Sequence, residues 1–144
     1  MVLMVSSKNS SARRRSILEA ALKCFSTDGY DATSIETICA ISGSSVGSLY
    51  HHFGNKEGVA ASLYEEGIVS YQAALVDMLG EGGTPGKVAE AIIRHHLTWV
   101  RANPEWARYL LQMGAAPATA TARPSVRRHN KVLLLALEEW SAPH

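Results

Sequence analysis

The sequence predicts an all-helical protein, with a head of three short helices followed by a longer helical bundle. Three observations predict this fold class. Glycine and proline divide the chain into segments of helical length, and apolar residues recur at helical spacing. In addition, no segment alternates apolar and polar residues over a strand length. With 144 residues, 47% of them hydrophobic, the chain can bury an ordinary core.

The first helix is expected from about Ala12 to Thr27. Its apolar residues recur at the i, i+3, i+4, i+7 spacing of one buried stripe, namely Leu18, Ala21, Leu22 and Phe25. Asp28 and Gly29 end it. The second helix starts at TSIETICAIS, where Thr33 and Glu36 have the spacing of a capping box.

Gly43 ends the second helix, because glycine adopts the left-handed conformation that follows many helix ends. Ser44 or Ser45 can cap a short third helix from about Val46 to His52. Leu49 and Phe53 are the residues expected to face inward from it.

Three cap signals predict the later helices. Asn55 suits the N-cap of a long fourth helix reaching about Leu79. Thr84-Pro85 and Asn103-Pro104 each place a cap residue before a proline, which suits the starts of a fifth and a sixth helix. The stretch 114–125 is expected to be a low-complexity loop. A seventh helix follows, with an apolar stripe of Val126, His129, Leu133, Leu137 and Trp140.

Charge is informative only locally, because 14 basic residues nearly balance 13 acidic ones. No acidic residue precedes Glu19, whereas Lys8, Arg13, Arg14 and Arg15 do, so we expect a basic N-terminal arm. Cys24 and Cys39 show no disulfide or metal spacing and are read as buried fillers. Without a predicted signal peptide or membrane span, the expected location is the cytoplasm.

The short third helix is predicted to read DNA. Two short helices joined by a glycine-containing turn, packed on a longer helix, form the layout of a helix-turn-helix. A helix from Ser45 to His52 is about 12 Å long at 1.5 Å per residue, close to the width of the major groove. The start of the helix is small enough for close approach, with Ser44, Ser45, Gly47 and Ser48. Tyr50 and His51 point outward, and Lys56 suits a phosphate contact. Arg13, Arg14 and Arg15 of the basic arm are also expected to contact DNA, the alternative being a solvated helix start.

The run TSIETICAISGSSVGSLYHHFGNKEG resembles the signature of the TetR family of transcriptional regulators, and the likeness covers roughly residues 12–65. By this resemblance, Thr33, Tyr50, His51 and Lys56 match positions that contact phosphates or base edges. The residues from Ser45 to Ser48 match the start of the recognition helix. Val46 departs from the polar or basic residue of many members. It can contact a thymine methyl but cannot bind guanine.

The resemblance implies a DNA-binding domain over residues 1–56 and a ligand-binding and dimerisation domain over residues 57–144. It further implies a homodimer on a palindromic operator, and a small apolar or amphipathic effector that releases the DNA. Family members usually add two long helices that pair between subunits. This sequence ends after the predicted seventh helix, so a truncated form or dimerisation through the last helix is expected.

The aromatic residues of the second half have two interpretations. They can be core residues, or they can line an effector pocket among the helices after the head. The candidate pocket residues are Tyr71, His95, Trp99, Trp106, Tyr109 and Met113.

Two other functions compete with the ligand-responsive repressor. One is a DNA-binding protein without an inducer, whose second half is a structural or partner-binding module. The other is an enzyme, but no catalytic set, phosphate loop or zinc motif supports it, and neither a cofactor nor a metal is expected. Neighbouring histidines such as His51 and His52 point about 100° apart on a helix, which does not suit a metal site.

Overall fold

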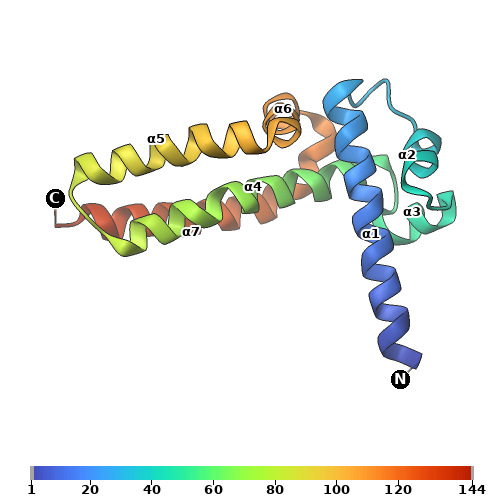
Figure 1. The fold of residues 1–144 in the computed structure, drawn as a ribbon, viewed down its shortest axis with the longest axis horizontal. Helices are drawn as coiled ribbons and strands as arrows, with labels where there is room; N and C mark the ends of the chain where they lie inside the picture. The colour runs from blue at the N-terminus through green and yellow to red at the C-terminus, as the bar shows by residue number, and fades with distance from the viewer. Residues whose placement is uncertain (1, 144) are drawn as a thin grey trace.

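The computed structural model describes residues 2–143, with side chains from Asn9 onward, so the side chain of Lys8 lies outside the described residues. Within this range the chain is helical and contains no strand, which confirms the predicted fold class (Figure 1). The elements are α1 (Val2–Thr27), α2 (Ile35–Ser42), α3 (Val46–Phe53), α4 (Lys56–Glu81), α5 (Pro85–Ala102), α6 (Pro104–Met113), the 3-10 helix η1 (Pro117–Ala122) and α7 (Arg123–Ser141).

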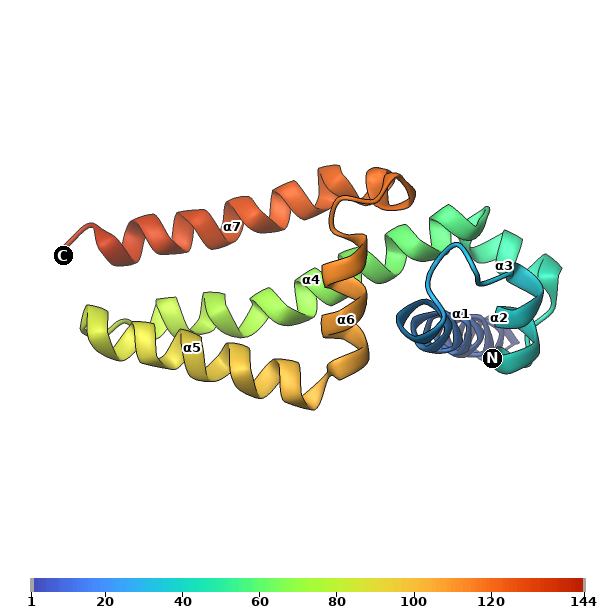
Figure 2. The ribbon, with the colours of Figure 1, turned by 90° about the horizontal axis from the view of Figure 1, so that it is seen from above.

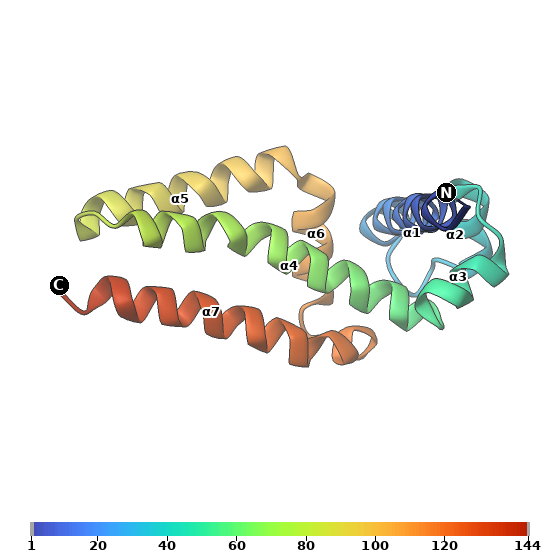
Figure 3. The ribbon, with the colours of Figure 1, turned by 90° about the horizontal axis from the view of Figure 1, so that it is seen from below.

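The long helix α4 connects the two halves of the molecule. At its start it packs against α1 and α3, and along its length it packs against α5, α6, η1 and α7. Helices α5 and α7 run along opposite sides of α4, while α6 crosses α4 close to the head (Figures 2 and 3). No helix within residues 2–143 is both long and apolar enough to cross a membrane.

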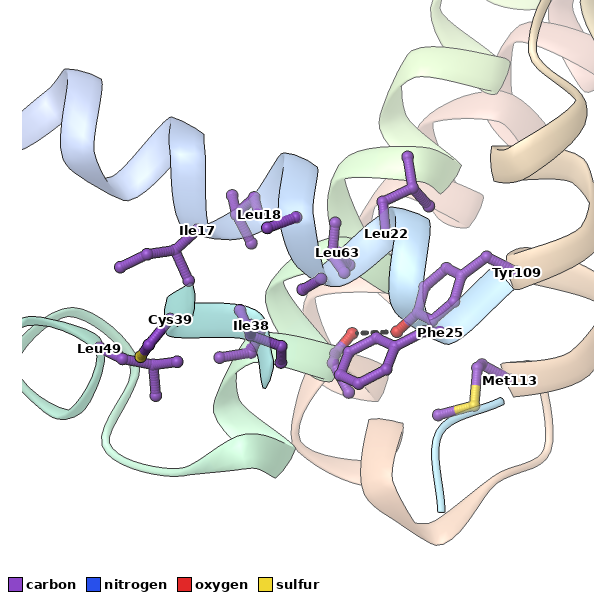
Figure 4. Close-up of a cluster of buried hydrophobic side chains, with 14 residues drawn as sticks. Ile17, Leu18, Leu22, Phe25, Ile38, Cys39, Leu49, Leu63, Tyr109 and Met113 are labelled. Atoms are coloured by element: carbon purple, nitrogen blue, oxygen red, sulfur yellow. Dashed lines mark hydrogen bonds between the residues drawn. The ribbon is translucent and has the colours of Figure 1, made fainter. Parts of the chain in front are cut away.

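One buried cluster joins the head to α6 (Figure 4). The head contributes residues such as Leu18 and Phe25 from α1, Ile38 from α2 and Leu49 from α3. The other side of the cluster comes from beyond the head, with Val59, Ala60 and Leu63 from α4, and Tyr109 and Met113 from α6. The head therefore shares its core with α4 and α6, although the predicted domain boundary at residue 56 falls at the first residue of α4.

Tyr109 is the centre of this shared core. Its side chain is 0% exposed, and its hydroxyl donates to the backbone oxygen of Ala60 over 2.7 Å. Its ring stacks on Phe25 of α1 with centroids 6.0 Å apart. Burial raises the pKa of Tyr109 far above its ordinary value, which keeps the phenol protonated as a donor. Of the two interpretations offered for Tyr109 and Met113, the structure therefore supports the core.

Two helix starts differ from the sequence prediction. Helix α1 begins at Val2 rather than near Ala12, so the expected basic arm is helical. Ser34, not Thr33, is the N-cap of α2, and it accepts a hydrogen bond from the backbone nitrogen of Thr37. The cap prediction for Thr33 is wrong because its buried hydroxyl donates to the backbone oxygen of Gly29 over 2.8 Å.

The segment expected to be a loop is also more ordered. It holds η1, and α7 begins at Arg123. Thr119 is buried, and its hydroxyl bonds to the backbone oxygens of Met113 and Ala116 over 2.8 and 2.9 Å. These bonds close the turn after α6, and η1 then packs on α4. Contacts with a distant helix therefore ordered a segment whose composition predicts a loop.

Gly67 sets the distance between α4 and α6. A Cβ atom at this buried position would lie 2.7 Å from Cε3 of Trp106 and 2.9 Å from Cδ2 of Leu110. Trp106 is half-buried and packs edge-on to Tyr109, with ring centroids 6.5 Å apart. The absent side chain at Gly67 thus lets α6 lie close enough to α4 for Tyr109 to reach Ala60.

We expect Gly67→Ala to lower the free energy of unfolding by about 1–3 kcal/mol, because the added methyl overpacks the crossing of α4 and α6. Gly80→Ala is the matched control in the same helix, since a Cβ there meets nothing within 4 Å. Urea unfolding followed by circular dichroism measures both. A stability for Gly67→Ala equal to that of Gly80→Ala would contradict the role of Gly67.

Candidate nucleic-acid interface

The turn between α2 and α3 is built by Gly43 and Ser45. Gly43 has a φ of 69°, in the left-handed region, and its amide donates to the backbone oxygen of Cys39. Ser45 then caps α3 by accepting a hydrogen bond from the backbone nitrogen of Ser48 over 3.1 Å. Leu49 is fully buried and anchors the short helix to the core, as the sequence predicts.

Anchoring through Leu49 leaves one face of α3 open to solvent. Val46 is 39% exposed and Tyr50 is 49% exposed. Ser45, Gly47 and His51 are exposed as well, and Ser44 and Ser48 are half-buried. A Cβ atom at Gly47 would meet nothing within 4 Å. No packing contact within the described residues therefore requires glycine there.

Basic residues from two helices meet at the end of α3. His52 is half-buried, and its pKa is lowered first by burial and then by the positive charges of His51, Arg14 and Arg13. The guanidinium of Arg14 lies over the ring of Phe53, with Cζ 5.2 Å from the centroid. The structure therefore brings the basic segment of α1 beside the exposed face of α3. His52 is a member of this group that the sequence reasoning did not include.

The three arginines have different surroundings. Nη1 of Arg15 forms an ion pair with Oε1 of Glu66 on α4 over 2.6 Å. Arg13 is exposed and forms no ion pair with any side chain in residues 9–143. Because Glu66 already pairs with Arg15, Arg13 and Arg14 are the better candidates for contact with an external anion. In Figure 1 the first turns of α1 extend past α3.

Lys56 has a contact that the sequence did not predict. Its Nζ lies 4.2 Å from the ring centroid of Tyr30, which gives this lysine a cation–π contact within the protein. Burial, together with the nearby Glu57 carboxylate, raises the pKa of Tyr30 to about 12, which keeps the ring neutral. The contact holds the ammonium at the start of α4, where Asn55 caps the helix by accepting from the nitrogen of Gly58 over 2.7 Å.

Thr33 is the predicted contact that fits least well. It is 4% exposed, and its hydroxyl is engaged inside the head. Its neighbour Ser34 is exposed at the same helix start, with its hydroxyl 2.9 Å from the hydroxyl of Thr37. The sequence contains two adjacent hydroxyl residues here, and spacing alone does not say which of them faces solvent.

A second group of predicted residues meets between α4 and α5. The ring centroid of Tyr71 lies 5.4 Å from that of His95 and 5.2 Å from that of Trp99. Nε2 of His95 bonds to the backbone oxygen of Tyr71 over 3.0 Å, and the Tyr71 hydroxyl bonds to Nδ1 of His96 over 2.9 Å. A cavity open to solvent begins at His95 and is lined by Met78, Lys87, Glu90, Ala91, Arg94 and Thr98. Trp106 lies elsewhere, against Gly67.

Within the described residues, no three His, Cys, Asp or Glu side chains gather as metal ligands. Cys24 and Cys39 are both buried and unpaired with each other, as expected for filler residues.

The sequence of residues 17–63 matches the family described as "Bacterial regulatory proteins, tetR family". This segment begins on the buried face of α1 and ends in the first turns of α4. It therefore contains α2, the Gly43 turn and α3. The segment that holds the candidate recognition helix is therefore a TetR-type head.

Individual TetR-family proteins agree with this assignment. The HTH-type transcriptional repressor AcnR of Corynebacterium diphtheriae is 32% identical over 80 residues, which are 56% of this chain and 40% of the repressor. PfmR of Thermus thermophilus is 29% identical, with a TM-score of 0.68 over 85% of this chain and 68% of that chain. A gamma-butyrolactone receptor described as ArpA-like is 26% identical, with a TM-score of 0.66 over 92% and 68%. The chain spans less than half the length of the repressors that it matches in sequence.

We expect two glycine substitutions, one just before α3 and one within it, to change stability in opposite directions. Gly43→Ala should cost about 1–2 kcal/mol, because an alanine at positive φ is strained. Gly47→Ala should raise stability by about 0.5–1 kcal/mol, because alanine favours the helix and the added methyl meets no atom. Thermal and urea unfolding measure both. A destabilised Gly47→Ala would show that Gly47 has a packing role.

Proposed function

We propose that this chain is a sequence-specific DNA-binding repressor of transcription that acts in the cytoplasm, with α3 as its recognition helix. The observation that carries the proposal is the exposed face of α3, where Val46 and Tyr50 stand open to solvent beside an uncrowded Gly47. The TetR head and the relation to a repressor over 80 residues support the same function. An enzyme has no support in these relatives, which are regulators.

In this proposal the start of α3 enters the major groove. The small residues from Ser44 to Ser48 allow the helix backbone close to the base edges, and the Val46 methyls contact a thymine methyl. Tyr50 and His51 contact bases or phosphates from the same face. Lys56, Arg13 and Arg14 neutralise phosphates, while Arg15 and Thr33 act through their contacts inside the protein.

Sequence specificity also requires two heads. A homodimer places two copies of α3 on a palindromic site, with half-sites about one helical turn or a multiple of it apart. The proposed division of labour assigns residues 1–56 to DNA and residues 57–144 to effector binding and dimerisation. Tyr109 joins the two parts in one core. In this proposal, a change in the position of α6 therefore changes the orientation of the DNA-binding head.

The proposed effector is a small apolar or amphipathic molecule with a flat part. The aromatic group of Tyr71, His95 and Trp99 offers ring faces and edges, and His96 and the Tyr71 hydroxyl offer polar contacts. Tyr109 and Met113 are core residues and are left out of this site. The rival hypothesis is that the second half is a structural or partner-binding module without an inducer.

DNA from upstream of the protein's own gene, titrated against a scrambled duplex by fluorescence anisotropy, tests the proposal. We expect tight binding to the first duplex only. Tyr50→Ala should lose about tenfold or more in affinity, because one base contact is worth about 1–3 kcal/mol, with unchanged helical content. Equal binding of the wild type and Tyr50→Ala would exclude the role given to Tyr50.

Lys56→Ala should weaken binding to every duplex alike and reduce the slope of log affinity against log salt by about one unit, as expected for one lost phosphate contact. Lys87→Ala is the control, because Lys87 is also a lysine near a helix start but belongs to α5, outside the proposed DNA-binding segment. A loss confined to one base position would contradict a phosphate contact.

A thermal-shift screen of flat amphipathic molecules separates the ligand-responsive repressor from its rival. A molecule that binds only the folded chain must raise the melting temperature, and Trp99→Ala should abolish the shift if the group around Tyr71 binds it. A shift that survives Trp99→Ala would place the ligand elsewhere. A complete absence of shifts across the screen would favour the rival.

A further inference from the structure

We propose that a cavity between the head and the end of α6 binds a small organic cation, an ammonium group that carries a short alkyl or aryl part. This junction cavity is lined by the turn between α1 and α2 (residues 29–31), by Glu57 of α4, and by residues of the segment 112–118 at the end of α6 and the start of η1. It is separate from the aromatic group at Tyr71, and binding to it is measured without DNA, so the proposal stands or falls separately from the proposed function.

The walls of the junction cavity are held in place by hydrogen bonds of the protein itself. On the head side, the Thr33 hydroxyl donates to the backbone oxygen of Gly29 over 2.8 Å. On the other side, the Thr119 hydroxyl donates to the backbone oxygen of Met113 over 2.8 Å and fixes the start of η1. The cavity has a volume of about 550 Å³, within the range of small-molecule sites. A ligand therefore meets a site that needs little ordering on binding.

The charge of the junction cavity favours a cation. Two carboxylates, Asp31 and Glu57, line it, and none of the described residues around it is basic. Neither carboxylate forms an ion pair with another side chain in residues 9–143. Lys56 precedes Glu57 in the chain, but its Nζ lies over the ring of Tyr30 and it does not line the cavity. The cavity therefore presents negative charge to a ligand, which attracts cations and repels anions.

The hydroxyl of Tyr30 gives a second, independent reason to expect a hydrogen-bond donor in the junction cavity. Tyr30 lines the cavity, and its hydroxyl oxygen is buried without a hydrogen-bond partner of ordinary geometry in the described residues, although the Glu57 carboxylate is near. A buried polar atom without a partner costs free energy. A neutral phenol oxygen accepts hydrogen bonds, and an ammonium N–H supplies the donor that this oxygen lacks.

The remaining lining favours an organic cation over a metal ion. Met113, Ala116, Pro117 and Ala118 form an apolar wall, which suits an alkyl or aryl group. Within the described residues, no three His, Cys, Asp or Glu side chains gather as metal ligands, so the two carboxylates lack the further protein ligand of a metal site. An ammonium group bonded to a short apolar part matches both the carboxylates and the apolar wall.

A ligand in the junction cavity contacts the head and the second half at once. Asp31 belongs to the head, whereas Met113 lies one turn after Tyr109 on α6, and both Met113 and Tyr109 are part of the shared core. The bound cation therefore stabilises the arrangement in which the turn between α1 and α2 lies against the end of α6, relative to any arrangement in which these segments separate.

Thermal-shift and calorimetric titrations of the full 144-residue chain, without DNA and at constant ionic strength, test the proposal. The probes are n-butylammonium and benzylammonium, with n-butanol and butyrate as uncharged and anionic compounds of similar size. Both ammonium ions should raise the melting temperature saturably, because they bind only the folded chain, whereas n-butanol and butyrate should not. Folded wild-type protein that binds neither ammonium ion, or that binds n-butanol equally well, would overturn the proposal.

Three substitutions of similar shape test the assigned residues. Asp31→Asn and Glu57→Gln should each weaken ammonium binding by about tenfold or more, because each removes a charged acceptor. Tyr30→Phe should weaken it by about threefold or more, because the hydroxyl is lost while the ring under Lys56 is kept. Glu105→Gln is the matched control, since Glu105 is an exposed carboxylate on α6 that does not line the cavity, and it should bind like the wild type.

Hydrogen exchange of the wild-type chain locates the bound cation without any substitution. Saturating n-butylammonium should slow amide exchange in residues 29–31 and 112–118, which form the two walls of the junction cavity. Circular dichroism of each variant confirms that it is folded. Protection confined to residues around Tyr71 and Trp99, or folded Asp31→Asn and Glu57→Gln chains that bind as tightly as Glu105→Gln, would contradict a site at the junction.

Discussion

The hydrogen bond from Tyr109 to Ala60, buried under the stacked ring of Phe25, is the contact on which the rest of the structure depends. This hydrogen bond joins α6 to α4, and the ring of Tyr109 also packs on Phe25 of α1. Breaking it would leave a buried polar group without its partner, which costs about 1–3 kcal/mol. The head cannot separate from α6 without that loss, so its orientation is tied to the helices that follow it.

The same shared core holds the short helix α3 in place. Helix α3 has only eight residues, and an isolated helix of that length is unstable in water. It persists because Leu49 is buried in a core completed by α4 and α6, and because Ser45 and Asn55 cap α3 and α4. The exposed face is then free to carry residues chosen for an external partner, including the unpacked Gly47 and the half-exposed Tyr50.

Features that depend on neighbouring residues were predictable from the sequence. The caps Ser45 and Asn55, the turn at Gly43 and the inward direction of Leu49 all follow from local rules, and the structure agrees. The placement of Thr33, Lys56 and Tyr109 was not predictable, because each is decided by a contact with a residue that spacing does not reveal. Thr33 bonds to Gly29, Lys56 lies over Tyr30, and Tyr109 reaches across to Ala60. The contacts proposed with DNA remain predictions.

Selection of binding sites from a pool of random duplexes measures the central claim most directly, because the pool contains every short operator sequence. If α3 reads base edges, the wild-type chain should enrich a defined motif, and Gly47→Leu should enrich none because the added side chain holds the helix away from the groove. Recovery of the same motif by Gly47→Leu, or the absence of any enriched motif with folded wild-type protein, would contradict the assignment of α3 as the recognition helix.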